Sequence, residues 1–212
     1  MIIALSRNIA LASTKLKAGI WDRKSFMGTE LYGKTLGIIG LGRIGKELAT
    51  RMQAFGMKTI GYDPIVSKEE AAKFNIESMS LEEMWPQVDY ISLHVPLIKA
   101  TKNLINLEVF QKCKKGVRVI NCARGGVINE DEAIVALDQG LCDGIAVDVY
   151  EEEPPTNRKF VEHEKVLCTP HIGASTKEAQ VRVAVDVAEQ LVCLMNGNPV
   201  WGCVNPTTLP SK

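Results

Sequence analysis

Short apolar runs recur along the chain from residue 34 onward, and helical stretches separate them. The runs are apolar at nearly every position, which is typical of strands buried on both faces. Glycine, proline or polar residues close them. The pattern therefore predicts strands at residues 35–40, 58–62, 90–95, 117–121, 144–149 and 166–169.

The intervening stretches carry the marks of helices. Residues 43–55 place Ile44, Leu48, Met52 and Phe55 on one face, the spacing of an amphipathic helix. Several other stretches open on a capping residue followed three positions later by an acid. These further helices are predicted at residues 67–74, 80–85, 129–140 and 175–196, the last three with the pairs Ser80–Glu83, Asn129–Glu132 and Ser175–Glu178.

Alternating buried strands and helices imply a parallel sheet, because each crossover between parallel strands lays a helix on a face of the sheet. We therefore predict an α/β fold of the Rossmann type, a doubly wound parallel sheet with helices on both faces. Ligands of such sheets bind at the C-terminal ends of the strands. The residues at those ends are the candidates for function.

The first twenty residues predict one amphipathic helix, with no signal peptide because charged residues interrupt its apolar positions. It opens without a capping residue or a preceding strand. We expect that the chain begins inside a longer natural sequence, although a start that simply lacks a cap is an alternative. The apolar stripe of this helix consists of Ile2, Leu5, Ile9, Ala12, Leu16 and Ile20.

A glycine-rich turn joins the first strand to the first long helix. Gly40, Gly42 and Gly45 form the pattern G-x-G-x-x-G, which is a weak signal alone but here has the strand and helix that it requires. The first glycine permits a tight turn, the second lets the backbone approach a pyrophosphate, and the third allows close packing. The helix N-terminus adds free N–H groups for phosphates.

Asp63 ends the next strand, about twenty residues beyond the glycines, as expected for a dinucleotide site. Its carboxylate can accept hydrogen bonds from both ribose hydroxyls and would repel a 2′-phosphate. We therefore predict NAD, rather than NADP, as the cofactor. The plainer alternative is that Asp63 and Pro64 merely begin a turn.

Three other strand ends bear polar residues, namely Arg124, Glu153 and His171. If the sheet is parallel, they meet at one edge and suit the oxidation of an alcohol. Arg124 can orient a substrate carboxylate, His171 can take the hydroxyl proton, and Glu153 can hold the imidazole. Each also has an alternative without chemistry, such as an ion-paired loop arginine or an acidic loop at 151–153. His94 and His163 are assigned no role.

Composition narrows the classes of function. The 25 basic residues equal the 25 acidic ones, so the chain lacks the basic excess typical of nucleic-acid or membrane-surface binding. The six cysteines are scattered, which predicts neither a disulfide framework nor a metal site and favours a reducing, cytoplasmic location.

These motifs, in this order, resemble the D-2-hydroxyacid dehydrogenase family over nearly the whole chain. Particular strings resemble one branch of it, whose substrate is a phosphorylated 2-hydroxy acid, and the string that follows His171 is the most specific of them. The strings lie at residues 26–31, 56–64, 113–119 and 173–180.

The resemblance implies that Arg124 binds substrate, Glu153 assists and His171 is the acid/base. It also implies NAD contacts from Arg43 and Ile44 at the pyrophosphate, and from Asp63 at the adenosine ribose. A homodimer is implied, with residues 1–26 near the partner. Around the adenine and nicotinamide, the implied neighbours are Val95, Pro96, Cys122, Ala123, Arg124, Asp148, His171, Gly173 and Ala174.

The resemblance also predicts a division of the chain. Residues 1–33 would form a leading helix and arm, 34–196 the NAD-binding domain, and 197–212 a tail returning toward a substrate lobe. Most of that lobe is expected to be absent, so the chain is expected to turn over poorly. Two alternatives stay open, a glyoxylate or hydroxypyruvate reductase and a non-catalytic NAD-binding scaffold. The string at 173–180 argues against the reductase. The presence of Arg124, Glu153 and His171 argues against the scaffold.

Overall fold

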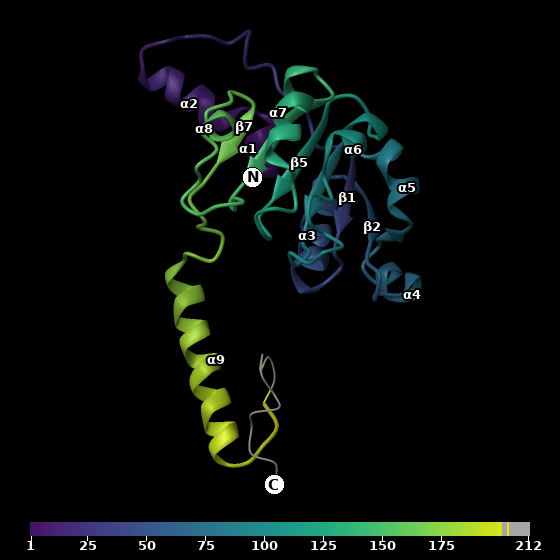
Figure 1. Ribbon diagram of the computed structural model, residues 1–212, viewed down its shortest axis with the longest axis vertical. Helices are drawn as coiled ribbons and strands as arrows, with labels where there is room; N and C mark the ends of the chain where they lie inside the picture. Colours follow the sequence, from purple (N-terminus) through teal and green to yellow (C-terminus); the bar gives the residue numbers. More distant parts are fainter. Residues whose placement is uncertain (201–202, 204–212) are drawn as a thin grey trace. The chain divides into compact units, whose positions relative to one another are not determined.

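The computed structural model describes residues 1–200 and 203. Within this part, seven parallel strands form one sheet in the order β3-β2-β1-β4-β5-β6-β7 (Figure 1). The predicted α/β fold of the Rossmann type is therefore confirmed. The strands are β1 (Thr35–Ile39), β2 (Lys58–Tyr62), β3 (Glu77–Ser78), β4 (Tyr90–Leu93), β5 (Val117–Asn121), β6 (Cys142–Val147) and β7 (Val166–Cys168).

Helices cover both faces of the sheet, as the apolar strands predicted. One layer packs on a core that includes Ile2, Ala49 and Ala71, and the other on a core that includes Phe110, Leu137 and Phe160. The first layer consists of α1 (Ile2–Ser6), α3 (Arg43–Ala54) and α4 (Lys68–Ala72). The second consists of α5 (Leu81–Met84), η1 (Trp85–Gln87), α6 (Leu107–Lys112), α7 (Glu130–Asp138) and α8 (Arg158–Val161).

The strand order reverses between β1 and β4, because β2 and β3 extend the sheet on one side of β1 while β4 to β7 extend it on the other. Loops leaving the C-terminal ends of these two strands run in opposite directions, which opens a crevice between them. The fold thus places a ligand site beside the glycine-rich turn.

The leading segment differs from the single helix that we predicted. It forms two helices, α1 and α2 (Ile9–Lys17), separated at Asn8, whose φ of 52° lies in the left-handed region. Ile2 and Leu5 are buried, whereas α2 buries none of its residues. The prediction of one continuous stripe was wrong, because the apolar positions of α1 pack on the sheet while those of α2 do not.

Helix α3 also turns a different face toward the core than the one that we predicted. Ile44 is 72% exposed and Phe55 is 48% exposed, whereas Gly45, Ala49 and Met52 are buried. The glycine lets the helix come so close to β1 that it, rather than Ile44, faces the sheet. Ile44 is thereby left free to face the crevice.

Contacts divide the chain into two compact units, residues 1–171 and 172–212. The predicted boundaries at 33/34 and 196/197 stay predictions. The second unit contains α9 (Lys177–Met195). The Thr176 side chain accepts a hydrogen bond from the Ala179 amide, so the predicted cap at Ser175 was wrong by one residue. Most of the predicted tail at 197–212 lies outside the described residues.

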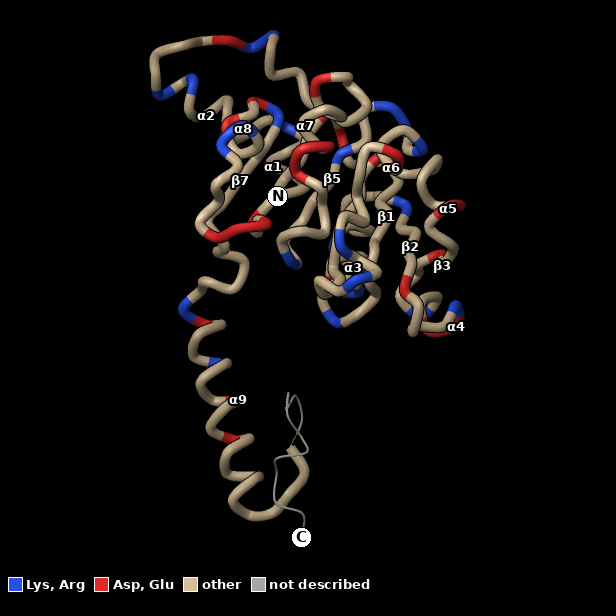
Figure 2. Tube along the Cα trace, viewed as in Figure 1, with Lys and Arg blue, Asp and Glu red and all other residues tan. Residues whose placement is uncertain are grey.

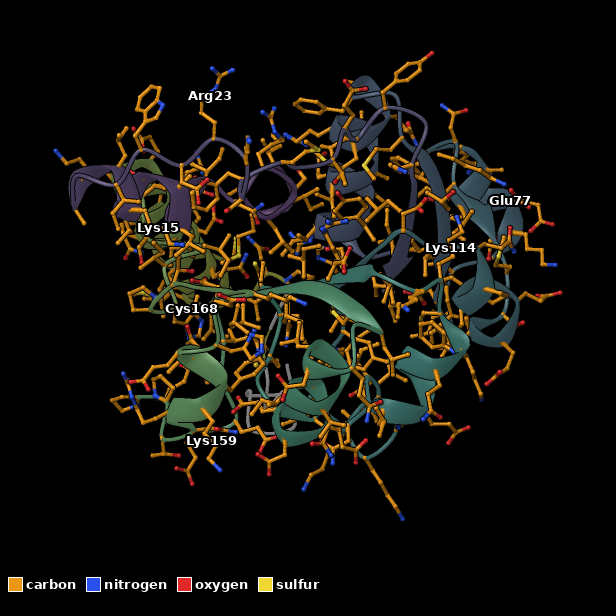
Figure 3. All side chains as sticks on the ribbon, turned by 90° about the horizontal axis from the view of Figure 1, so that it is seen from above. Lys15, Arg23, Glu77, Lys114, Lys159 and Cys168 are labelled. Carbon is orange, nitrogen blue, oxygen red and sulfur yellow. The ribbon has the colours of Figure 1, made fainter. Side chains whose placement is uncertain are left out.

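Charges of both signs are mixed along the trace of the first unit (Figure 2). Its leading segment carries the exposed Trp21 and Met27, and Arg23 on the same segment points away from the rest of the unit (Figure 3). Among the described residues, no helix has the length and apolar character needed to cross a membrane.

Candidate active site and cofactor cleft

The three glycines of the turn between β1 and α3 meet three different steric demands. Gly40 has a φ of +95°, and a Cβ there would collide with the carbonyl oxygen of His94. A Cβ at Gly45 would collide with the carbonyl oxygen of Gly40, whereas one at Gly42 would meet no atom within 4 Å. The turn is therefore tight at Gly40, close-packed at Gly45 and open to an approaching group at Gly42.

Asp63 fastens this turn to the end of β2. Its Oδ2 accepts a hydrogen bond from the Leu41 amide at 2.8 Å, and its Oδ1 accepts bonds from the amides of Ile65 and Val66 at 2.8 and 3.1 Å. Burial alone would raise the pKa of this carboxyl, but the three amides outweigh it and hold the pKa below its usual value. Asp63 therefore stays ionised, and the turn suggested by the plainer alternative is present as well.

An open cleft of about 520 Å³ lies at the C-terminal ends of β1, β4 and β5. Arg43 and Arg124 are exposed and form no ion pair with any described residue. Two cations without counter-charges suit an anionic ligand. The cleft is lined by Gly42, Arg43, Ile44, Gly45, His94, Val95, Cys122, Ala123 and Arg124.

The cleft fits the predicted dinucleotide. The Gly42 position has no side chain to block a pyrophosphate, and α3 begins there without a side-chain cap. The first amides of such a helix lack intrahelical partners and carry partial positive charge, so they can bind phosphate. The residues present can therefore hold NAD.

His94 was missed as a cleft residue by the sequence reasoning. It follows β4, and its Nε2 lies 2.9 Å from the Ser92 hydroxyl. Burial lowers the pKa of His94 to about 4, so the ring is neutral near pH 7. Its place at a strand end was the signal that could have identified it.

Glu153 and His171 form a pair across two loops. The His171 Nδ1 lies 2.7 Å from the Glu153 Oε2, and this hydrogen bond is the main cause that lowers the pKa of the Glu153 carboxyl. His171 has a φ of 52°, in the left-handed region, a costly conformation that often occurs at functional sites. Its side chain is 54% exposed, so the ring can reach a substrate.

Tyr150 and Thr169 hold the two loops of this pair through hydrogen bonds. The Tyr150 amide donates to the Glu153 Oε1 at 3.2 Å, and the Tyr150 hydroxyl donates to the Thr169 carbonyl at 2.7 Å. That carbonyl also accepts the His171 amide at 3.0 Å. The Thr169 hydroxyl in turn donates to the buried Asp148 at 2.5 Å. One network therefore fixes both loops.

The segment that carries Arg124 touches the loop that carries Glu153. Asn121 shapes this segment, because its side chain accepts the Ala123 amide at 3.0 Å and donates to the Arg124 carbonyl at 2.8 Å. A Cβ at Gly125 would overlap the carbonyl of Tyr150. The two loops are thus packed backbone against backbone. Asn121 was also missed by the sequence reasoning, although it is a polar residue at a strand end.

Several residues of the predicted set lie elsewhere. Gly40 and Asp63 support the turn, Asp148 is buried under Thr169, and Pro96 is not among the residues that line the cleft. Gly173 and Ala174 belong to the second unit, so their predicted place beside the nicotinamide stays a prediction.

The remaining candidate chemistry is sparse. All six cysteines are free thiols. Within residues 1–200 and 203, no group of three or more His, Cys, Asp or Glu side chains is arranged to hold a metal ion.

Comparison with known proteins agrees with this geometry. D-3-phosphoglycerate dehydrogenase of Rattus norvegicus is 54% identical over 211 residues, covering 100% of this chain and 40% of the relative. The enzyme of the same name from Bacillus subtilis (strain 168) is 49% identical over 205 residues, covering 97% of this chain and 39% of the relative. The chain therefore spans about two fifths of the length of these relatives.

A solved structure gives the same result for the fold. A glyoxylate reductase from Paecilomyes thermophila superposes with a TM-score of 0.87 at 32% identity, covering 94% of this chain and 61% of that chain. The family model described as "D-isomer specific 2-hydroxyacid dehydrogenase, NAD binding domain" matches residues 1–173, which confirms the predicted cofactor. The chain belongs to the D-isomer specific 2-hydroxyacid dehydrogenase family, a family of NAD-dependent oxidoreductases.

Proposed function

We propose that this chain is the NAD-binding part of an enzyme that oxidises 3-phospho-D-glycerate to 3-phosphohydroxypyruvate, the first step toward serine. The observation that carries the proposal is the 2.7 Å contact between His171 and Glu153, because the loop that bears Glu153 also packs against the Arg124 segment. The relatives named D-3-phosphoglycerate dehydrogenase support this choice of substrate, because they match at 54 and 49% identity whereas the glyoxylate reductase matches at 32%.

The proposed roles follow from the geometry. Glu153 accepts the Nδ1 proton of His171, which leaves Nε2 as the base for the substrate hydroxyl. NAD, when bound, supplies the acceptor for the hydride that leaves C2. As the C2–H bond breaks and the carbonyl forms, the hydroxyl proton passes to Nε2, and the Glu153 carboxylate offsets the positive charge on the ring. Arg124 holds the substrate carboxylate by a charge-assisted hydrogen bond.

Cofactor contacts are proposed at the cleft and around it. Arg43, Ile44 and the amides after Gly42 face the pyrophosphate, and Asp63 faces the adenosine ribose. Asp63 already accepts one bond at Oδ2, and a carboxylate oxygen has room for another. The other proposed contacts are Val95, Pro96, Cys122, Ala123, Asp148, His171, Gly173 and Ala174.

Turnover, partners and location are also proposals. We propose that efficient turnover needs a substrate lobe beyond this chain, which spans 40% of the length of a relative. We also propose a homodimer in which the exposed Trp21 and Met27 of the leading segment face the partner. Six free thiols support a reducing, cytoplasmic location.

The proposal is tested by titrating the chain with NADH by calorimetry and by assaying oxidation of 3-phosphoglycerate in parallel with reduction of glyoxylate. Asp63→Ala should weaken binding about tenfold or more, because it removes hydrogen bonds to the ribose and the bond that fastens the glycine turn at Leu41. Asp63→Asn tests the charge, and Asp138→Ala at the far end of α7 is the control.

The outcomes separate the alternatives. Two results together support the proposal. NADH binding should be weakened by Asp63→Ala, and the chain joined to the substrate lobe of a relative should prefer 3-phosphoglycerate to glyoxylate. A preference of this joined enzyme for glyoxylate would favour the alternative of a glyoxylate reductase. NADH binding without any turnover would favour a non-catalytic NAD-binding scaffold. A folded chain that does not bind NADH would contradict the cofactor site itself.

A further inference from the structure

Glu130, the first residue of α7, is a buried carboxylate that the proposed mechanism does not use. It is 7% exposed, whereas Asp131 beside it is exposed. Burial raises the pKa of Glu130, and the nearby Glu151 carboxylate contributes to the rise. Carboxylates at this depth are rare unless they have partners. Its position therefore needs an explanation beyond the acidic first turn of a helix.

The partners of Glu130 lie on the segment that carries Glu153. The Glu130 Oε1 accepts the Glu151 amide at 3.0 Å. The Asn157 side chain also lowers the pKa of this carboxyl, and its Nδ2 donates to the Oδ1 of Asp131, the next residue of α7, at 3.1 Å. The first two residues of α7 therefore bind the segment 151–157 near both of its ends.

A short chain of contacts leads from Glu130 to the imidazole. The Glu151 amide is fixed by Glu130, and the preceding amide, that of Tyr150, donates to the Glu153 Oε1 at 3.2 Å. The other oxygen of Glu153 lies 2.7 Å from His171. A shift of the main chain at residues 150 and 151 would therefore move Glu153 relative to the ring.

Glu130 also belongs to the segment that leads from Arg124 into α7. Gly125 of this segment lies against the carbonyl of Tyr150, where a Cβ would overlap it. The backbone contact at Gly125 and the carboxylate of Glu130 thus hold the same turn at two adjacent residues, Tyr150 and Glu151. Together they tie the Arg124 segment to the Glu153 loop.

We propose that Glu130 is a positioning residue that fixes the turn bearing Glu153 and, through it, the orientation of the His171 imidazole. Its importance for catalysis rests on the proposed function, but its effect on the turn does not. The length of the side chain matters for this role, because the carboxylate must reach the Glu151 amide. The charge matters less, since a neutral amide oxygen can accept the same bond.

The competing explanation for Glu130 is electrostatic. The N-terminus of α7 carries partial positive charge and would be stabilised by any acid in its first turn. The two explanations make opposite predictions for two conservative variants. Glu130→Asp keeps the charge but shortens the side chain, whereas Glu130→Gln keeps the length and loses the charge. Asp131→Asn serves as the control, because it removes a charge from the same turn but keeps an oxygen that can accept the Asn157 side chain.

Amide hydrogen exchange of the chain, followed by NMR, tests the proposal without NAD or substrate. In Glu130→Asp, the Glu151 amide should exchange about tenfold faster or more, because the shortened side chain no longer reaches it and the hydrogen bond is lost. In Glu130→Gln it should stay within about threefold of the wild type, as it should in Asp131→Asn. The ¹⁵N shifts of the His171 ring should show a less uniform tautomer in Glu130→Asp alone.

Three results would overturn the proposal. One is a Glu151 amide in Glu130→Asp that exchanges as in the wild type. Another is an equal acceleration in Glu130→Gln, which would point to the helix charge. The third is uniform acceleration across β5 and β6 in Glu130→Asp, which would mean that Glu130 supports the whole unit. If the enzyme proved to have another activity, the exchange results would still decide the role of Glu130 in the turn.

Discussion

Two regions of the site are built in different ways. The glycine turn, residues 40–45, is held mainly by close main-chain contacts with adjacent elements, with Asp63 as a side-chain anchor. The dyad region, residues 148–153 and 169–171, is held by side chains that cross between loops, with Glu153 and His171 as its pair. A turn held by main-chain contacts is disturbed chiefly where a substitution adds a Cβ against the backbone. A region held by side chains loses a contact when any one of those side chains is replaced.

The largest expected effect is on the dyad region. His171→Asn removes the proposed base, and turnover of 3-phosphoglycerate should fall about a thousandfold, a typical contribution of general acid–base catalysis. The free energy of unfolding should change little, since the ring is 54% exposed. Steady-state kinetics of the enzyme with its substrate lobe measures the effect, with His163→Asn as the control. A fall of less than about tenfold would rule out the assigned role.

In the glycine turn, a substitution at a close-packed position should lower the free energy of unfolding. Gly45→Ala places a Cβ against the Gly40 carbonyl and should lower the free energy of unfolding by about 3 kcal/mol, as overpacking does. Gly42→Ala is the matched control, because its Cβ meets nothing within 4 Å. It should unfold like the wild type in urea yet bind NADH more weakly. Equal stability of the two variants would contradict the assigned packing.

His94, between the two regions, should make stability depend on pH. The pKa of His94 is about 4 when folded, against about 6.5 for an unfolded histidine. Between these values the unfolded chain binds the proton and the folded chain does not, so stability is lost as pH falls. The loss between pH 7 and pH 5 should be about 2 kcal/mol. Urea unfolding of His94→Gln should lack this part of the slope, whereas His163→Gln should keep it.

The smallest expected effect concerns the support of the dyad. Burial raises the pKa of Tyr150 to about 12, so its hydroxyl remains a donor to the Thr169 carbonyl at any working pH. Tyr150→Phe should lower the free energy of unfolding by about 1 kcal/mol, the net value of one hydrogen bond. Chemical denaturation measures it. A loss confined to stability, with turnover unchanged, would show that the Tyr150 amide alone suffices to hold Glu153.

The same contrast explains what the sequence could predict. The strands and the glycine turn follow local rules, because periodicity and spacing along the chain determine them. The short helices α6 and α8 were missed, because they cannot display a helical period and their caps, Asn106 and Asn157, are not followed three positions later by an acid. The break at Asn8 was missed because a left-handed residue leaves no mark in the apolar pattern.

Side-chain support of the site could not be predicted in the same way. The depth of Glu130, the burial of His94 and the bond of Asn121 to the Arg124 segment all depend on elements that meet only in the folded chain. By contrast, the sequence predicted that Glu153 holds the His171 imidazole, and the two side chains lie 2.7 Å apart on loops that follow the neighbouring strands β6 and β7.

If the glycine turn binds the cofactor and Glu153 serves the chemistry on the substrate, changes at the two regions should separate in cofactor binding. Calorimetric titration of Gly42→Val and Glu153→Gln with NADH, beside the wild type, measures this separation. We predict that Gly42→Val weakens binding about a hundredfold or more, because a side chain then occupies the pyrophosphate approach, while Glu153→Gln binds like the wild type. Wild-type affinity in Gly42→Val, or an equal loss in Glu153→Gln, would contradict the account.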